Sequence, residues 1–127
     1  MDEQEARRIM SVLGKAEGEF AASLIVPIYW VIQEEGARVR ARNGTAFFVD
    51  AGEGPFGVTA SHVLEGWRED SRTNRIRSLQ LSDLAFELEG RHRIIAEHPG
   101  MDLATFHITA EEVRSLGKTV LAGYQSE

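Results

Sequence analysis

The sequence has no cysteine among its 127 residues. This absence excludes a disulfide framework, a thiolate nucleophile and any zinc site built on sulfur ligands. The chain also lacks internal repeats and low-complexity segments, and its 14.1 kDa leave room for a single domain with one modest core. A cysteine-free chain fits the cytoplasm best, and this is the location that we expect.

Positive charge is scarce too, because 14 Lys and Arg residues against 20 Asp and Glu residues leave a net charge of −6. Such a chain has no general attraction for phosphate backbones or anionic lipids, so we expect neither nucleic acid nor a membrane as a partner. The uncharged run from Phe20 to Ile32 is too short to span a bilayer, and the acidic residues before it have the wrong sign for a secretory signal. We interpret this run as a buried strand.

Hydrophobic periodicity predicts a short helix within residues 1–19. Acidic residues cluster in its first turn, and Gly14 is a plausible end. The apolar residues at helical spacing are Ala6, Ile9, Met10 and Leu13. We expect this helical extension to pack on the rest of the fold.

Residues 20–108 have the pattern of short β-strands, with many β-branched and aromatic residues. Turn signals arrive about every ten residues without a long helix between them, which favours a small antiparallel β-barrel or sandwich over a parallel α/β sheet. Pro27 indicates an edge or a bulge at its position. The predicted strands lie within 23–32, 37–52, 58–64, 76–81, 84–98 and 102–108, with turns at 34–36, 52–57 and 89–90 and a charged loop at 67–75.

Residues 109–127 are predicted to form a linking helix and the first strand of a second barrel. Thr109 and Glu112 have the spacing of a capping box, and Gly117 fits the end of the helix. The strand after this helix stops soon after it begins, so we expect the chain to be truncated.

One glycine pattern matches a nucleotide-binding motif weakly. Gly52, Gly54 and Gly57 satisfy G-x-G-x-x-G after a strand, and Asp70 follows at nearly the distance of a ribose-binding acid. The motif needs a helix to open inside it, whereas Pro55 and its neighbours favour a turn and then a strand. We interpret these glycines as a hairpin loop and keep a nucleotide-binding α/β protein as a third hypothesis.

His62 stands in an apolar, β-branched run, GVTASHVL, at residues 57–64. The partner strand of the same hairpin reads GTAFFV at residues 44–49. This order resembles the chymotrypsin-like (trypsin-like) serine peptidases, in which a G-[ST]-[GA]-F strand precedes a T-A-[AS]-H segment with the general-base histidine. Forty residues later, Asp102 directly precedes Leu103 and an alanine, which resembles the D-[LI]-A motif of the orienting aspartate in that family.

The resemblance covers roughly residues 23–124 and implies roles for two residues. A serine hydroxyl is a poor nucleophile at neutral pH, so an imidazole accepts its proton through Nε2 while a carboxylate holds Nδ1–H. The resemblance implies that His62 is this base and Asp102 this carboxylate. It also implies a peptide or protein substrate that is cleaved through an acyl-enzyme.

The third member of such a triad is absent from the sequence. In the family the nucleophile lies in a G-[DN]-S-G-G loop of a second barrel, whose amides also form the oxyanion hole, and no serine here has that context. Ser61 is next to His62, but neighbours on an extended strand point to opposite faces, so we exclude it as a partner. We expect the chain alone to be inactive.

No metal and no other cofactor is predicted. His92, His98 and His107 have the spacing of no recognised metal site. The arginines at 38, 40 and 42 alternate along one strand and are interpreted as a solvated face.

The first hypothesis is therefore an antiparallel β-barrel, the N-terminal half of a trypsin-like double barrel, with a short N-terminal helix and a short C-terminal linking helix. We expect a bacterial type of peptidase, because cysteine and an activation-type signal are absent. The alternative is a non-catalytic module, a pseudopeptidase that binds a peptide or protein. An unpaired barrel edge would also favour self-association.

Overall fold

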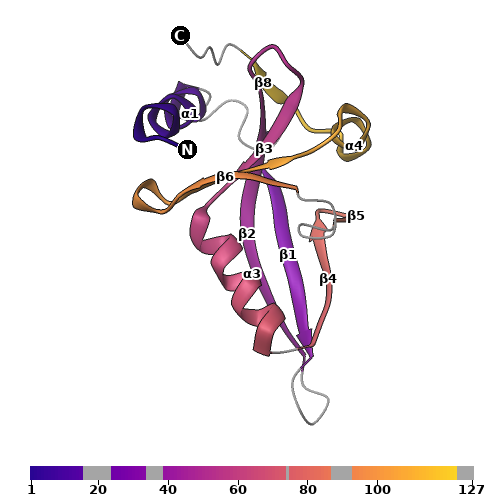
Figure 1. Cartoon of the computed structure of the whole chain (residues 1–127). Coiled ribbons are helices and arrows are strands. Elements are labelled where there is room, and N and C mark those ends of the chain that lie inside the picture. Colours follow the sequence, from indigo (N-terminus) through magenta and orange to yellow (C-terminus); the bar gives the residue numbers. More distant parts are fainter. Residues whose placement is uncertain (16–23, 34–38, 74, 87–92, 123–127) are drawn as a thin grey trace.

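Eight strands form one sheet in the computed structural model, which describes residues 1–15, 24–33, 39–73, 75–86 and 93–122 (Figure 1). The helices are α1 (Glu3–Lys15), α3 (Ser61–Thr73) and α4 (Ala110–Leu116), with a 3₁₀ turn, η2 (Pro99–Met101). The predicted mainly β, antiparallel class is confirmed. The strands are β1 (Val26–Gln33), β2 (Val39–Asp50), β3 (Pro55–Thr59), β4 (Arg75–Leu81), β5 (Leu84–Ala85), β6 (Ile94–His98), β7 (Leu103–His107) and β8 (Val120–Ala122).

The strands lie across the sheet in the order β5-β4-β1-β2-β3-β7-β6, and each neighbouring pair in this row is antiparallel. β8 is different, because it pairs in parallel with β2 from Phe48 to Asp50. The strand that was expected to open a second barrel therefore lies in this sheet, beside β2.

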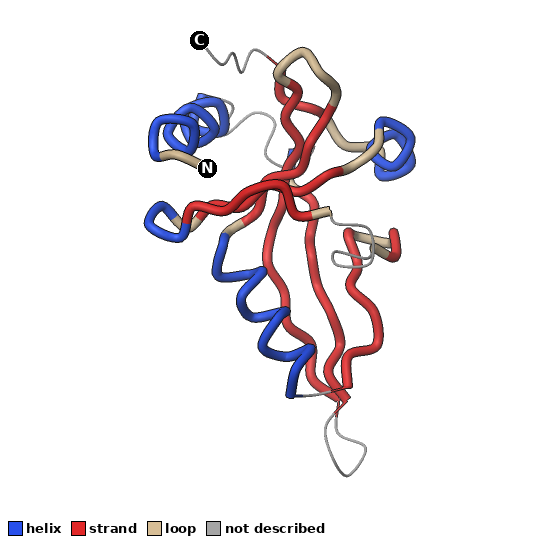
Figure 2. The backbone as a smooth tube through the Cα atoms, in the orientation of Figure 1, coloured by secondary structure: helices blue, strands red, loops and turns tan. Residues whose placement is uncertain are grey.

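The sheet curls so that its two ends share one core. Phe86, just after β5, meets Phe106 of β7 edge to face with ring centroids 5.4 Å apart, and the guanidinium of Arg93 lies 4.1 Å from the centroid of the Phe86 ring. Figure 2 shows the strands at the centre and the helices around them. Among the described residues, no hydrogen-bonded pairing joins the two ends of the sheet. The predicted barrel is therefore not closed, and the strands form an open, curled sheet.

Buried side chains form two clusters, one on each face of the sheet, because successive residues of a strand point to opposite faces. α3 covers the larger cluster, which includes Ile28, Trp30, Phe48, Leu64 and Phe106. α1 covers the smaller cluster, where Ala6 and Ile9 are fully buried with Phe47, Val49, Val58 and Leu103. The helix predicted near the N-terminus is thus confirmed as a cover of one sheet face, and it ends one residue after Gly14.

The structure corrects the prediction for residues 58–75. β3 ends at Thr59, and the segment predicted as a strand end followed by a charged loop is the helix α3. Val63, Leu64 and Trp67 recur at helical spacing and pack against the core of the sheet. Glu65 and Glu69 are exposed on the outer side of the same helix, whereas Asp70 is buried on its inner side. Charged residues on both sides of the helix make the segment resemble a loop in the sequence.

The hairpin loop between β2 and β3 explains two of the three glycines in the G-x-G-x-x-G pattern. Gly52 and Gly54 have φ values of +103° and +100°, and their N–H groups donate to Oδ1 of Asp50 at 2.7 and 3.2 Å. Gly57 lies beyond the loop, within β3. A strand rather than a helix opens after the loop, so the nucleotide-binding hypothesis is wrong.

The remaining local predictions have mixed outcomes. The capping box of α4 is confirmed between Thr109 and Glu112, and Gly117 ends this helix with φ +67°. β1 is an inner strand paired with β2 and β4, so Pro27 lies near the start of an inner strand and not on an edge. The predicted turns at 34–36 and 89–90, with Arg38 and His92, lie outside the described residues. Within the described ranges, no helix is long and apolar enough to cross a membrane.

Two glycine substitutions should have opposite effects on stability. A Cβ at Gly57 would overlap the ring of Phe106, so Gly57→Ala should lower the free energy of unfolding by about 1–3 kcal/mol. A Cβ at Gly66 in α3 would lie at an ordinary distance of 3.7 Å from Trp30, so Gly66→Ala should raise it by roughly 0.5–1 kcal/mol through helix propensity. Urea unfolding of both variants tests this, and equal stabilities would contradict the packing described for β3 and β7.

Candidate active site

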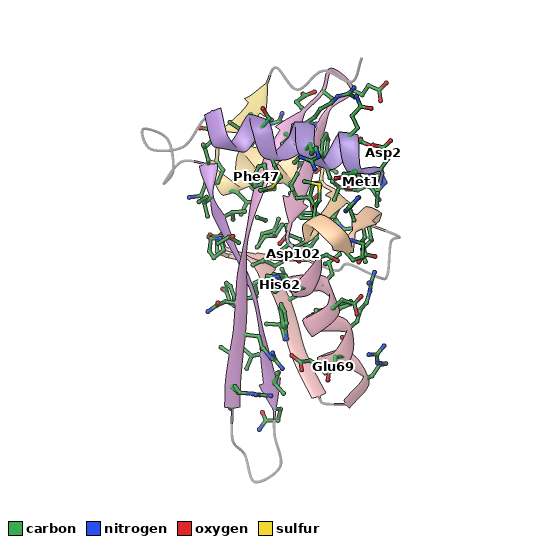
Figure 3. The ribbon with its side chains drawn as sticks, turned by 90° about the vertical axis from the view of Figure 1, so that its left-hand side faces the viewer. Met1, Asp2, Phe47, His62, Glu69 and Asp102 are labelled. Carbon is green, nitrogen blue, oxygen red and sulfur yellow. The ribbon has the colours of Figure 1, made fainter. Side chains whose placement is uncertain are left out.

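Pairing between β3 and β7 brings His62 and Asp102 together. Thr59, the last residue of β3, is the register partner of Ala104 in β7. Since α3 begins two residues after Thr59 and Asp102 lies two residues before Ala104, the start of the helix meets the residue before the strand. Figure 3 shows the His62 and Asp102 side chains next to each other at this junction.

Asp102 accepts hydrogen bonds from both the ring and the backbone of His62. Its Oδ2 lies 2.5 Å from Nδ1 of the ring, and its Oδ1 accepts the backbone N–H of His62 at 2.8 Å. The backbone N–H of Ser61 also interacts favourably with this carboxylate. An ionised carboxylate only accepts, so Nδ1 carries a proton and Nε2 of a neutral ring keeps its lone pair free to accept another.

The pKa of Asp102 follows from these contacts. Partial burial acts to raise the pKa of this carboxyl, but the hydrogen bonds from the backbone and ring of His62, its charge and the N–H of Ser61 together outweigh burial. The pKa therefore lies below the ordinary aspartate value. Asp102 is accordingly a carboxylate over the whole pH range in which a histidine changes charge.

The turn before β7 presents Asp102 in an unusual backbone conformation. Asp102 ends η2 with φ +53° and ψ +51°, and its N–H donates to the carbonyl of Pro99 at 3.0 Å. This left-handed region is sparsely populated by residues other than glycine, although aspartate tolerates it better than most. The turn therefore fixes the direction in which the carboxylate faces His62.

Close packing and a buried carboxylate hold α3 in place. A Cβ at Gly44 would lie 2.6 Å from Cγ2 of Val63, so only glycine lets the residue after His62 approach β2. Asp70 is buried, with only 2% of the residue exposed. Its carboxylate accepts hydrogen bonds from Nε1 of Trp30 at 2.9 Å and from Nε of Arg42 at 3.1 Å. The arginines of β2 that the structure describes, Arg40 and Arg42, are exposed as the predicted solvated face requires, and Arg42 also pairs with buried Asp70. The sequence singles out Asp70 only as a candidate ribose ligand.

A second ion pair links the same helix to β6. Arg68 donates to both carboxylate oxygens of Glu97, at 3.0 and 2.8 Å, and also to Glu65 at 2.8 Å. Hydrogen bonds to Glu97 and Glu65 raise the pKa of Arg68, with burial opposing them. α3 is therefore anchored to β1 and β2 by Asp70 and to β6 by Arg68.

His62 and Asp102, called the dyad below, are open to solvent, with 74% of the His62 side chain and 49% of the Asp102 side chain exposed.

The serines of α3 and α4 have other roles. Ser71 and Ser115 donate their hydroxyls to carbonyls of their own helices, Trp67 O and Glu112 O. Ser61 is buried and begins α3. The reason given for excluding it as a partner of His62, that neighbours on a strand point to opposite faces, therefore does not apply. Its contribution to the dyad is the backbone N–H, which helps to lower the pKa of Asp102.

The other histidines of the described ranges lie outside the dyad. Nδ1 of His98 accepts the N–H of Met101 at 3.0 Å, and His107 is exposed on β7. Within the described part of the chain, no group of three or more His, Asp or Glu side chains could hold a metal ion.

Comparisons with known proteins identify no relative of this chain. No protein-family model, no curated protein and no solved structure matches the chain.

Replacing Asp102 by asparagine should reverse the tautomer of His62. The backbone N–H of His62 needs an acceptor at the Oδ1 position, so the amide oxygen of Asn takes that place and the NH₂ group faces Nδ1. Nδ1 then becomes the acceptor, and the neutral ring carries its proton on Nε2. Long-range ¹H–¹⁵N spectra distinguish the two tautomers, with His107 as an internal reference; an unchanged Nδ1–H tautomer would contradict the contact between His62 and Asp102.

The lowered pKa of Asp102 also predicts a pH dependence of stability. Because this pKa is lower in the folded than in the unfolded chain, ionised Asp102 stabilises the fold above the ordinary aspartate pKa of about 4, and this contribution is lost as the pH falls through the folded value. The stability difference between the natural chain and Asp102→Asn should thus shrink from pH 6 to pH 2 in urea unfolding. Asp83→Asn, at an exposed position, controls for the loss of one charge, and a constant difference would argue against the shift.

Proposed function

We propose that this chain is the N-terminal barrel portion of a trypsin-like serine peptidase, with His62 as the general base and Asp102 as its orienting carboxylate. One observation carries the proposal: Asp102 accepts from the ring of His62 at 2.5 Å and from the backbone of the same residue at 2.8 Å. This double contact fixes the position and the tautomer of the ring at once, which is what a general base for a hydroxyl nucleophile requires.

The proposed chemistry uses the free Nε2 of His62. A serine hydroxyl brought to this nitrogen gives up its proton as Oγ attacks the scissile carbonyl, and Asp102 stabilises the imidazolium that forms. The imidazolium then returns the proton to the leaving amine as the peptide C–N bond breaks, which leaves an acyl-enzyme. Water, deprotonated by the same nitrogen, hydrolyses the ester.

The nucleophile has to come from outside these 127 residues, because the sequence contains no G-[DN]-S-G-G segment. The exposed ring of His62 is accessible to such a segment. The substrate would be a peptide or protein and the chemistry would need no cofactor. The cysteine-free composition supports a cytoplasmic location.

The missing nucleophile motif also favours a second candidate, a pseudopeptidase that binds a peptide or protein without cleaving it. In that case the dyad would have a structural role, tying α3 to β7. An unpaired strand edge would be the surface for pairing with a partner strand, or with a second copy of the chain.

A fluorophosphonate probe tests the first candidate, because it reacts with a serine activated by a histidine base. The 127-residue chain alone should not be labelled. If the reading frame continues past Glu127 to a G-[DN]-S-G-G segment, the longer product should be labelled at that serine. His62→Ala in the longer product should slow labelling by roughly 10⁴-fold, because the triad acts as a unit. His107→Ala, at an exposed histidine of β7, is the matched control.

Two results would decide against the peptidase. A stop directly after Glu127, with no separate chain that restores labelling, favours the pseudopeptidase. Stoichiometric labelling of a serine in the chain alone would show that the nucleophile is within these residues and that the assignment of roles is wrong.

A further inference from the structure

We propose that His98 is a positioning residue for Asp102, because its ring accepts the hydrogen bond that closes the η2 turn. That this positioning serves catalysis rests on the proposed function. The hydrogen bond itself and the experiment that tests it do not depend on catalytic activity. His98 ends β6 and precedes η2, whereas Asp102 follows η2. Nδ1 of His98 accepts the N–H of Met101 at 3.0 Å.

This ring nitrogen takes the place of the usual helix N-cap. The N-cap position normally has the side-chain oxygen of Ser, Thr, Asp or Asn, which accepts an N–H of the first turn. Pro99 follows directly and needs no acceptor, since it has no N–H. At the other end of the turn, the N–H of Asp102 donates to Pro99 O at 3.0 Å. One side-chain bond and one backbone bond therefore define the turn that holds Asp102 at φ +53°.

Gly100 makes room for the ring of His98 over this turn. A Cβ at Gly100 would lie 3.2 Å from Cε1 and 3.6 Å from Nδ1 of His98. A residue with a side chain would press against the ring that caps the turn. The sequence HPGMD at 98–102 thus supplies an acceptor, a residue without N–H, a residue without Cβ, the donor and the presented carboxylate, in that order.

Because Nδ1 of His98 accepts, a neutral ring of His98 has its proton on Nε2. This is the opposite tautomer to that of His62, whose Nδ1 donates to Asp102. A second proton on His98 would occupy the accepting nitrogen and remove the cap. The strength of the turn, and with it the presentation of Asp102, is therefore coupled to the protonation of a histidine outside the dyad.

The charged groups near His98 belong to α1, to β6 and its ion-pair partner on α3, and to the end of η2. Glu3 of α1 interacts electrostatically with His98, while its carboxylate is paired with Arg7 at 2.8 Å. Glu97, the preceding residue of β6, directs its carboxylate to Arg68 of α3, and its carbonyl lies 3.5 Å from the N-terminal ammonium. Asp102 lies at the far end of the turn. A cationic His98 would be attracted by Glu3 but would lose the bond to Met101.

The test compares two substitutions in the full ¹⁵N-labelled chain. His98→Ala removes the acceptor, whereas His98→Asn restores an acceptor that is common at N-caps. We expect the amide hydrogen of Met101 to exchange about fivefold faster in His98→Ala, as for loss of a typical N-cap bond, and near the natural rate in His98→Asn. The Nδ1–H signal of His62 should broaden in His98→Ala and be retained in His98→Asn. His107→Ala should change neither signal.

Unchanged exchange of Met101 in His98→Ala would overturn the proposal, and so would equal acceleration in both variants, because the ring and not its acceptor would then matter. If His98→Ala does not fold, the natural chain decides: protection of Met101 should fall as His98 gains its second proton, and the fall should be absent in His98→Asn. Protection that does not change through the titration of His98 overturns the cap. Absence of a serine partner would end the peptidase proposal without affecting these measurements.

Discussion

The carboxylate of Asp102 joins two parts of the chain that are far apart in sequence. It accepts hydrogen bonds from the first turn of α3 and from the ring of His62, while the backbone of the same residue ends the turn that leads into β7. A helix N-terminus has unpaired N–H groups and a partial positive charge, and an anion satisfies both. The contact that positions the candidate base is therefore also the contact that stabilises the start of its helix.

Much of the architecture could be predicted because it depends on local pattern. β1 and β7 are apolar, β-branched segments between turn signals, and the capping box of α4 is a spacing of three residues. Asp102 and His62 were singled out from short motifs, and the structure brings them into contact. These features have signals within a few residues, so a single sequence is enough to find them.

The features that were missed depend on partners distant in sequence. α3 was predicted as a strand end and a loop because its buried face includes an acid, and Asp70 becomes explicable only through Trp30 on β1. Gly57 was assigned to a loop because the side chain that requires a glycine there, the ring of Phe106, lies on the distant strand β7. Helical spacing of Val63, Leu64 and Trp67 was the one signal in the sequence that could have identified α3.

The register between β3 and β7 has a consequence for how the protein folds. The hairpins of β1, β2 and β3 join neighbouring segments, whereas Thr59 and Ala104 meet only after the chain closes a loop that includes α3, β4, β5 and β6. Loop closure must precede the contacts that reward it, so pairings between distant segments form slowly. We therefore expect the contact between His62 and Asp102 to form later than the hairpins of β1, β2 and β3, so its presence reports that β3 and β7 have paired.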